Sequence, residues 1–198
     1  MIPGLDQRPI IVALAGPNGA GKSTFYGVHL EPAGLRLINA DVFSKELRID
    51  PYQAAQIAGA LRNKFVELKE SFVFETVFSD PVGDKLDFLK NTAAKGYNVI
   101  LCFIGIAGPE TSEERVAMRV SQGGHDVPTE KLAARFPRTL ENLKKSIPML
   151  PRVFVFDNQD LANPFRKVAI FHQGKAVYLA DKLPSWMPKI DDSCEGKQ

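Results

Sequence analysis

Short apolar stretches alternate along this chain with segments whose apolar residues recur at helical spacing. The apolar stretches lie at 10–15, 35–38, 72–74, 99–104 and 153–156. Continuous apolar runs of this length are typical of parallel strands that are buried on both faces of a sheet. Helices are expected between them, at about 22–29, 42–47, 51–70, 82–94, 109–120 and 129–147. The alternation predicts an α/β fold with three layers, in which helices cover a five-stranded parallel sheet.

The pattern changes after the fifth apolar stretch. Residues 168–172 and 176–179 are strand-like and flank the turn sequence Gln173-Gly174-Lys175, which predicts an antiparallel C-terminal β-hairpin. Trp186 is expected to pack on this hairpin, and the proline-bearing tail after Leu183 is expected to be irregular and partly mobile. No repeat or linker divides the 198 residues. We therefore expect one domain, with a core at about 8–160, a lid at about 119–138, and the hairpin and tail over 165–198.

A glycine-rich motif follows the first predicted strand. Residues 16–24 match G-x-x-x-x-G-K-[ST], the phosphate-binding P-loop, in the order of strand, turn and helix that the motif requires. Glycines let successive backbone N–H groups converge on one anion, and the following helix adds the positive end of its dipole. Lys22 is expected to reach the β- and γ-phosphates of ATP, and the Ser23 hydroxyl to bind Mg²⁺. The predicted nucleotide-binding residues are Gly16, Pro17, Asn18, Gly19, Ala20, Gly21, Lys22, Ser23 and Thr24.

Composition narrows the remaining function classes. The apolar fraction of 44% and the charged fraction of 24% are those of an ordinary globular protein, and the net charge is only +2. Lysine and arginine are scattered, so no basic stripe indicates nucleic acid. No apolar run approaches the length of a membrane span, and the N-terminus lacks the order of a signal peptide. Because Cys102 lies in a predicted strand and Cys194 in the polar tail, a disulfide is not expected, and a cytoplasmic protein is.

Two carboxylates stand where predicted parallel strands end. Asp41 follows the second strand, and Glu75 with Thr76 follows the third. Ligands of open α/β sheets bind beyond the carboxyl ends of the strands, and phosphoryl transfer to an alcohol needs a carboxylate that accepts the hydroxyl proton. Two alternatives stay open: Asp41 could cap the helix at 42–47, and Glu75 could pair with a neighbouring cation. The fourth strand ends at Gly105 without the acid that a motor ATPase requires.

Four arginines flank the loop Gly123-Gly124-His125. Phosphoryl transfer needs cations beyond the γ-phosphate, often on a mobile lid. Arg115 and Arg119 are four residues apart and therefore share one helix face. The pair Gly123-Gly124 would serve as a hinge. His125 is expected to be a structural loop residue, and Asn158, after the fifth strand, is placed where a loop could cover the adenine base. The arginines are Arg115, Arg119, Arg135 and Arg138.

Taken together, these motifs resemble the zeta-toxin family of P-loop kinases, in particular its short members. Beyond the P-loop, the combination of Glu75-Thr76 with the segment Gly-Gly-His-x-Val-Pro is the specific part of the resemblance, which covers about residues 8–160. The resembling segments are 16–24, 39–41, 74–79, 97–106, 115–120, 123–128, 135–138 and 142–143.

The resemblance implies a P-loop NTPase fold like that of adenylate kinase and transfer of the γ-phosphate of ATP, with Mg²⁺, to a sugar hydroxyl. UDP-N-acetylglucosamine is the best-known acceptor class, and an antitoxin protein is an implied partner. By motif, Asp41 would be the general base, and Arg119 and Arg135 the lid arginines. Lys22 and Ser23 would contact phosphate and metal. The implied substrate contacts are Asp41, Glu75, Thr76, Arg115 and Arg138.

Two other functions compete with this one. The first is a P-loop kinase for another small alcohol or nucleotide, because the chain is shorter than the founding toxins. The second is an ATP-binding regulatory or transport subunit, because the same P-loop sequence also occurs in ABC transporter ATPases. The ABC signature Leu-Ser-Gly-Gly-Gln and the guanine motif Asn-Lys-x-Asp are both absent from the sequence.

Overall fold

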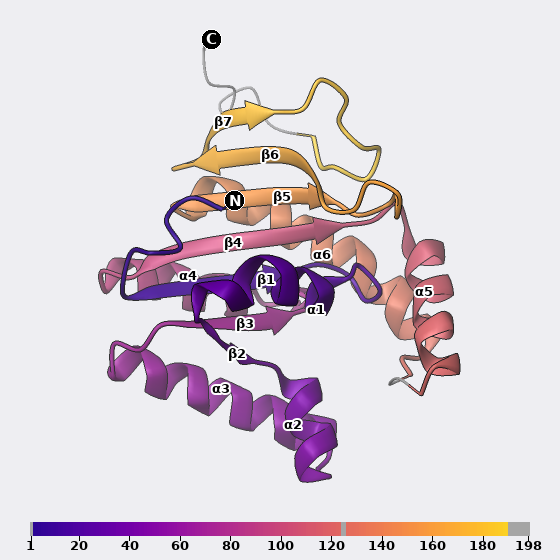
Figure 1. The fold of residues 1–198 in the computed structure, drawn as a ribbon, viewed down its shortest axis with the longest axis horizontal. Coiled ribbons are helices and arrows are strands. Elements are labelled where there is room, and N and C mark those ends of the chain that lie inside the picture. Colours follow the sequence, from indigo (N-terminus) through magenta and orange to yellow (C-terminus); the bar gives the residue numbers. More distant parts are fainter. Residues whose placement is uncertain (1, 124–125, 190–198) are drawn as a thin grey trace.

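The computed structural model describes residues 2–123 and 126–189, and its central element is a mostly parallel sheet. The strand order is β2-β3-β1-β4-β5-β6-β7, as Figure 1 shows. The first five strands pair in parallel, whereas β6 and β7 run antiparallel. The strands are β1 (Ile10–Ala15), β2 (Arg36–Ile38), β3 (Phe72–Thr76), β4 (Asn98–Gly105), β5 (Arg152–Asp157), β6 (Arg166–His172) and β7 (Lys175–Leu179).

Helices connect the parallel strands. The helix after the P-loop changes type, from α to π to 3₁₀, before the chain enters β2. The helical elements are α1 (Lys22–Phe25), η1 (Tyr26–Leu30), η2 (Glu31–Ala33), α2 (Ala40–Leu47), α3 (Pro51–Glu67), α4 (Asp84–Ala94), α5 (Pro109–Ser121) and α6 (Thr129–Met149).

Strand β1 is buried along its whole length and separates two apolar cores. Alternate side chains of a strand point to opposite faces. Ile11, Ala13 and Ala15 belong to a core that includes residues of α3, α4 and α6. Val12 and Leu14 belong to the other, which includes residues of α1 and η1. Helices thus cover both faces, and the prediction of a three-layer α/β fold is confirmed.

The C-terminal hairpin joins the main sheet. Strand β6 pairs with β5 from Arg152↔His172 to Asp157↔Arg166, with a register shift between Val155 and Phe156. The described part of the chain therefore has a seven-stranded sheet, in which the five predicted parallel strands are extended by the two predicted hairpin strands. By pairing with β6, β5 gains a neighbour on each side and is not left as an open edge.

Capping residues fix two of the helices around the cleft. The Asp50 carboxylate accepts from the backbone N–H groups of Tyr52 and Gln53, with Pro51 at the first position of α3. In α2 the cap is Asn39, whose side chain accepts from the N–H of Asp41. The alternative in which Asp41 itself caps this helix is therefore wrong, because Asn39 already occupies the capping position and frees the Asp41 carboxylate.

Trp186 packs at the carboxyl ends of β4 and β5. Its ring lies over Gly105, where an added Cβ would be 2.3 Å from the indole, and its centroid is 6.0 Å from that of Phe103. Its Nε1 donates to Asp157 Oδ1 at 2.9 Å. Trp186 therefore attaches the C-terminal segment to the middle of the sheet. It also belongs to the same core as Val168, Ala169 and Phe171 of the predicted hairpin. The predicted tail beyond residue 189, including Cys194, lies outside the described residues.

Candidate active site

The P-loop has the backbone conformation that its glycines permit. Gly16, Gly19 and Gly21 have φ values of 145°, 74° and 87°, a region that residues with a Cβ seldom adopt. A Cβ at Gly16 would lie 2.1 Å from the carbonyl oxygen of Ile104. The turn therefore depends on glycine for both backbone conformation and close packing, as the sequence motif predicts.

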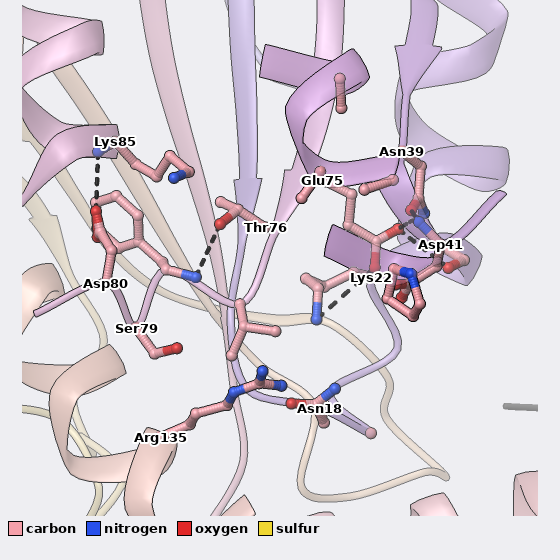
Figure 2. Close-up of a pocket in the computed structure, with 18 of the residues that line it drawn as sticks. Asn18, Lys22, Asn39, Asp41, Glu75, Thr76, Ser79, Asp80, Lys85 and Arg135 are labelled. Atoms are coloured by element: carbon pink, nitrogen blue, oxygen red, sulfur yellow. Dashed lines mark hydrogen bonds and ion pairs between the residues drawn. The ribbon is translucent and has the colours of Figure 1, made fainter. Parts of the chain in front are cut away.

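The Glu75 carboxylate joins the P-loop to the ends of two neighbouring strands. Ser23 Oγ donates to Glu75 Oε2 at 3.2 Å, and Asn39 Nδ2 donates to the same oxygen at 3.0 Å. Lys22 Nζ lies 3.8 Å from Glu75 Oε1, and Figure 2 shows Lys22, Asn39 and Glu75 converging on one end of the cleft. The resemblance implies a substrate contact for Glu75, but here its carboxylate lies against the two P-loop side chains assigned to phosphate and metal.

Lys22 is held within its own loop. Its Nζ donates to the carbonyl oxygens of Gly16 and Pro17 at 2.9 and 3.0 Å, and its side chain is only 6% exposed. Burial lowers the pKa of Lys22, and the positive charge of Arg119 acts in the same direction, whereas Glu75 and Asp41 raise it. The acids thus favour the protonated form, which is the form that binds phosphate oxygens.

Asp41 faces the same cleft from the first turn of α2. It lies two residues beyond Asn39, whose amide is bonded to both the Asp41 N–H and Glu75. Asn39 therefore orients the Glu75 carboxylate and holds the start of α2, which carries Asp41. Sequence reasoning missed this role of Asn39, although an asparagine directly before a helix is a recognised capping signal.

Helix α5 and the loop after β5 support the P-loop by donating hydrogen bonds to its carbonyl oxygens. Ser112 Oγ donates to the Asn18 carbonyl at 2.6 Å, and Arg115 donates to the carbonyl oxygens of Gly19 and Gln159 at 3.5 and 3.0 Å. Asn158 Nδ2 donates to the Ala20 carbonyl at 2.9 Å, and its Oδ1 accepts from the Phe165 N–H. The Asn158 side chain is thus engaged with the protein, and the contact with adenine expected for this position stays a prediction.

A cleft of about 730 Å³ opens beside the P-loop, and Ser112 and Asn158 support the loop without lining it. Most of the P-loop lines this cleft, but Gly16, Pro17 and Ala20 do not. Asp41, Glu75, Thr76 and all four arginines singled out from the sequence also line it, and Figure 2 shows Arg135 extending into it from α6. Thr76 Oγ1 accepts from the Phe78 N–H, which shapes the turn after β3. The two glycine-loop residues Gly124 and His125 lie outside the described residues. Lining residues that sequence reasoning missed include Arg62, Ser79, Asp80 and Lys85.

The donor set at the P-loop fits a magnesium nucleotide. Mg²⁺ is usually bound by one or two protein oxygens together with phosphate oxygens and waters, and Ser23 and Glu75 offer such oxygens side by side. Within residues 2–123 and 126–189, no group of three or more His, Cys, Asp or Glu side chains could hold a metal alone. In the same ranges, no helix has the length and apolar character needed to cross a bilayer.

The sequence model of the zeta toxin family matches residues 51–168, which is more than half of the chain. This chain belongs to the zeta toxin family. The matched part holds Glu75 and the arginines of α5 and α6. It begins after the P-loop and Asp41, which are placed instead by the P-loop motif and the cleft geometry. Among curated proteins, no significant sequence match was found.

Several solved structures share the fold of this zeta toxin family member. A chain of the AvrRxo1-ORF1:AvrRxo1-ORF2 complex with sulphate ions aligns with a TM-score of 0.70 at 19% identity, over 93% of this chain and 66% of that one. The same complex with ATP aligns with a TM-score of 0.67 at 19% identity, over 85% and 60%. The PezAT toxin–antitoxin system of Streptococcus pneumoniae gives 0.60 at 19% identity, over 81% and 71%. This chain thus spans less than two thirds of the AvrRxo1 chains that it matches.

Proposed function

We propose that this protein is an ATP- and Mg²⁺-dependent kinase that transfers the γ-phosphate to a hydroxyl of a small molecule. The observation that carries the proposal is the convergence of Lys22, Ser23, Glu75 and Asp41 on one cleft. A P-loop binds the phosphates of a nucleotide, and a carboxylate beside it, here that of Asp41, can accept a proton from an alcohol. The crystallisation of a complex of similar fold with ATP supports ATP as the donor.

In the proposed reaction, Asp41 takes the proton of the acceptor hydroxyl. The hydroxyl oxygen attacks the γ-phosphorus, the bond from that phosphorus to the β–γ bridging oxygen breaks, and ADP leaves. Lys22 and the P-loop N–H groups hold the phosphates, while Arg119 and Arg135 neutralise the charge that develops on the transferred group. Ser23 and Glu75 would hold Mg²⁺, which supplies further neutralisation of phosphate charge when bound.

We propose a sugar nucleotide of the UDP-N-acetylglucosamine type as the acceptor, on the strength of membership in the zeta toxin family. The competing candidate is another small alcohol or nucleotide. We further propose that the chain forms a single kinase domain and works in the cytoplasm, where ATP is available. We also propose that an antitoxin controls its activity. The toxin–antitoxin system among the structures of similar fold supports that last part. Closure of the segment at 119–138 over the nucleotide stays a prediction.

The test is phosphoryl transfer from labelled ATP by the wild type and by Asp41→Asn. We expect the variant to bind ATP as the wild type does and to lose about 10²–10⁴ in transfer rate, the usual contribution of a general base. Glu46→Gln, an exposed acid on the same helix, is the matched control. Full transfer by Asp41→Asn would refute the general base, and absence of ATP binding with Mg²⁺ would refute the kinase. Slow hydrolysis with no acceptor found would favour a regulatory ATP-binding protein.

A further inference from the structure

Arg62 adds a cation to the lining of the same cleft. It belongs to α3 and lines the cleft together with Ala55 and Ala58 of the same helix. Its Cζ lies 5.1 Å from the ring centroid of Phe74 on β3 and 5.8 Å from that of Phe88 on α4. Two aromatic rings from different elements therefore fix the position of the guanidinium.

The guanidinium has no acidic partner among the described residues. None of the hydrogen bonds or ion pairs found within 2–123 and 126–189 uses its five N–H donors, whereas the guanidinium of Arg166 pairs with Asp157 at 3.2 Å. Burial lowers the pKa of Arg62, and no acid acts in the opposite direction. A partly buried cation without a counter-charge is costly, so the binding of an anion there would be favoured.

The cleft holds further cations besides Arg62. Lys85 and Arg138 line the same cleft. The acid Asp80 also lines the cleft, where its Oδ2 accepts from the backbone N–H of Lys85 at 2.9 Å and its Oδ1 accepts from Asn142 Nδ2 at 3.3 Å. Figure 2 shows Asp80 and Lys85 together, away from the group of Lys22, Glu75 and Asp41.

We propose that Arg62 binds an anionic group of the acceptor, so that the molecule phosphorylated is an alcohol that also carries a phosphate, diphosphate or carboxylate. The inference rests on the proposed kinase function and makes Arg62 a determinant of acceptor specificity. A guanidinium is suited to this role because its planar fork matches the paired oxygens of phosphate and carboxylate. The ATP phosphates have their own cations at the P-loop.

The experiment compares acceptors in matched pairs with and without the anionic group. The pairs are UDP-N-acetylglucosamine and N-acetylglucosamine, UMP and uridine, and gluconate and glucose. Transfer from labelled ATP is measured with the wild type, Arg62→Met and Arg62→Lys. Lys64→Met is the control, because Lys64 is an exposed cation on the same helix that pairs with Glu67 outside the cleft. Binding of each compound is also measured calorimetrically in the presence of Mg²⁺ and a non-hydrolysable ATP analogue.

We expect the wild type to prefer the anionic member of at least one pair. Arg62→Met should raise the KM for that acceptor at least about tenfold, as for loss of a charged hydrogen bond, and leave the KM for ATP unchanged. Arg62→Lys should recover part of the loss, and Lys64→Met should behave as the wild type does. Because Arg62→Met removes a cation that lacks a counter-charge, its melting temperature should equal or exceed that of the wild type.

Three results would overturn the role of Arg62. One is a wild type with no preference for the anionic member of any pair, in transfer or in binding. Another is an unchanged KM in Arg62→Met. The third is a lowered melting temperature with equal losses for all acceptors, which would mean that Arg62 only holds α3 against the aromatic rings. In contrast, normal ATP binding and ligand binding without any transfer would refute the kinase and leave the anion contact standing.

Discussion

Glu75 connects side chains that come from three separate parts of the chain. Its carboxylate accepts hydrogen bonds from Ser23 and Asn39 and lies beside Lys22. The sequence places it after a strand and identifies it as a carboxylate near the active site, but leaves its partners undetermined. The structure makes it the acid closest to the P-loop lysine and hydroxyl, which are the groups assigned to phosphate and metal.

A substitution at Glu75 should therefore change how ATP binding depends on pH. Glu75 raises the pKa of Lys22 against the effect of burial, so Glu75→Gln lowers that pKa further. Lys22 must be protonated to bind phosphate, and it loses its proton as pH rises. The alkaline loss of ATP affinity should thus begin at a lower pH in the variant, and transfer at pH 7 should fall about tenfold to a hundredfold.

Calorimetric titration of ATP between pH 7 and pH 10 checks this expectation. Glu70→Gln, an exposed acid that precedes β3, is the control and should titrate as the wild type does. An alkaline loss at the same or a higher pH in Glu75→Gln would mean that the carboxylate does not support the charge of Lys22.

At the scale of the element, helix α5 supports the P-loop. Ser112 is almost fully buried and bonds the carbonyl of Asn18, while Arg115 from the next turn reaches Gly19 and Gln159. From the sequence, Arg115 was expected to contact the substrate. Its contacts here hold the loop conformation on which phosphate binding depends, and the substrate contact stays a prediction.

Ser112→Ala should weaken ATP binding through the shape of the loop. The variant leaves the Asn18 carbonyl without this donor, which costs about 1–3 kcal/mol when the group stays buried. We expect an ATP dissociation constant about fivefold to fiftyfold higher, with a fold that still melts cooperatively. Ser121→Ala, at the exposed end of the same helix, should have no effect. Equal ATP affinity of Ser112→Ala and the wild type in calorimetry would contradict the supporting role of α5.

At the scale of the whole molecule, the residues after the hairpin return to the middle of the sheet. Trp186 covers Gly105 and donates to Asp157, whose other carboxylate oxygen pairs with Arg166 of β6. This contact joins β4, β5, β6 and the C-terminal segment at the edge of the sheet that also carries the P-loop. Residues far outside the motif set therefore stabilise the part of the sheet behind the active site.

Trp186→Phe should lower the free energy of unfolding by about 2–4 kcal/mol. The loss combines a hydrogen bond to a charged group with a smaller ring in a packed site. Chemical denaturation followed by circular dichroism measures it, since Trp186 is the only tryptophan in the sequence. Tyr178→Phe, a partly exposed aromatic on β7, is the control. A change below about 0.5 kcal/mol, typical of surface substitutions, would mean that the contact does not stabilise the fold.

Features that depend on contiguous residues could be predicted from the amino-acid order alone. Apolar runs locate buried strands because each run must fill a strand, and the P-loop is recognisable because its conformation needs glycines at fixed spacing. The capping of α3 by Asp50 and Pro51 is local in the same way. Element boundaries were predicted less precisely. The helix expected to reach about residue 70 ends at Glu67, and Lys69, two residues later, adopts a positive φ of 58° that does not belong to a right-handed helix.

Which side chains meet in the active site became known from the folded arrangement. Glu75 and Ser23 are 52 positions apart, and Asn158 and Ala20 are 138 apart, so no local pattern specifies their contact. The position of Arg62 is equally non-local, because it depends on Phe74 and Phe88 from two other elements. The physical reason is the same in each case. Strand pairing and helix packing set these distances, and packing depends on the whole chain at once.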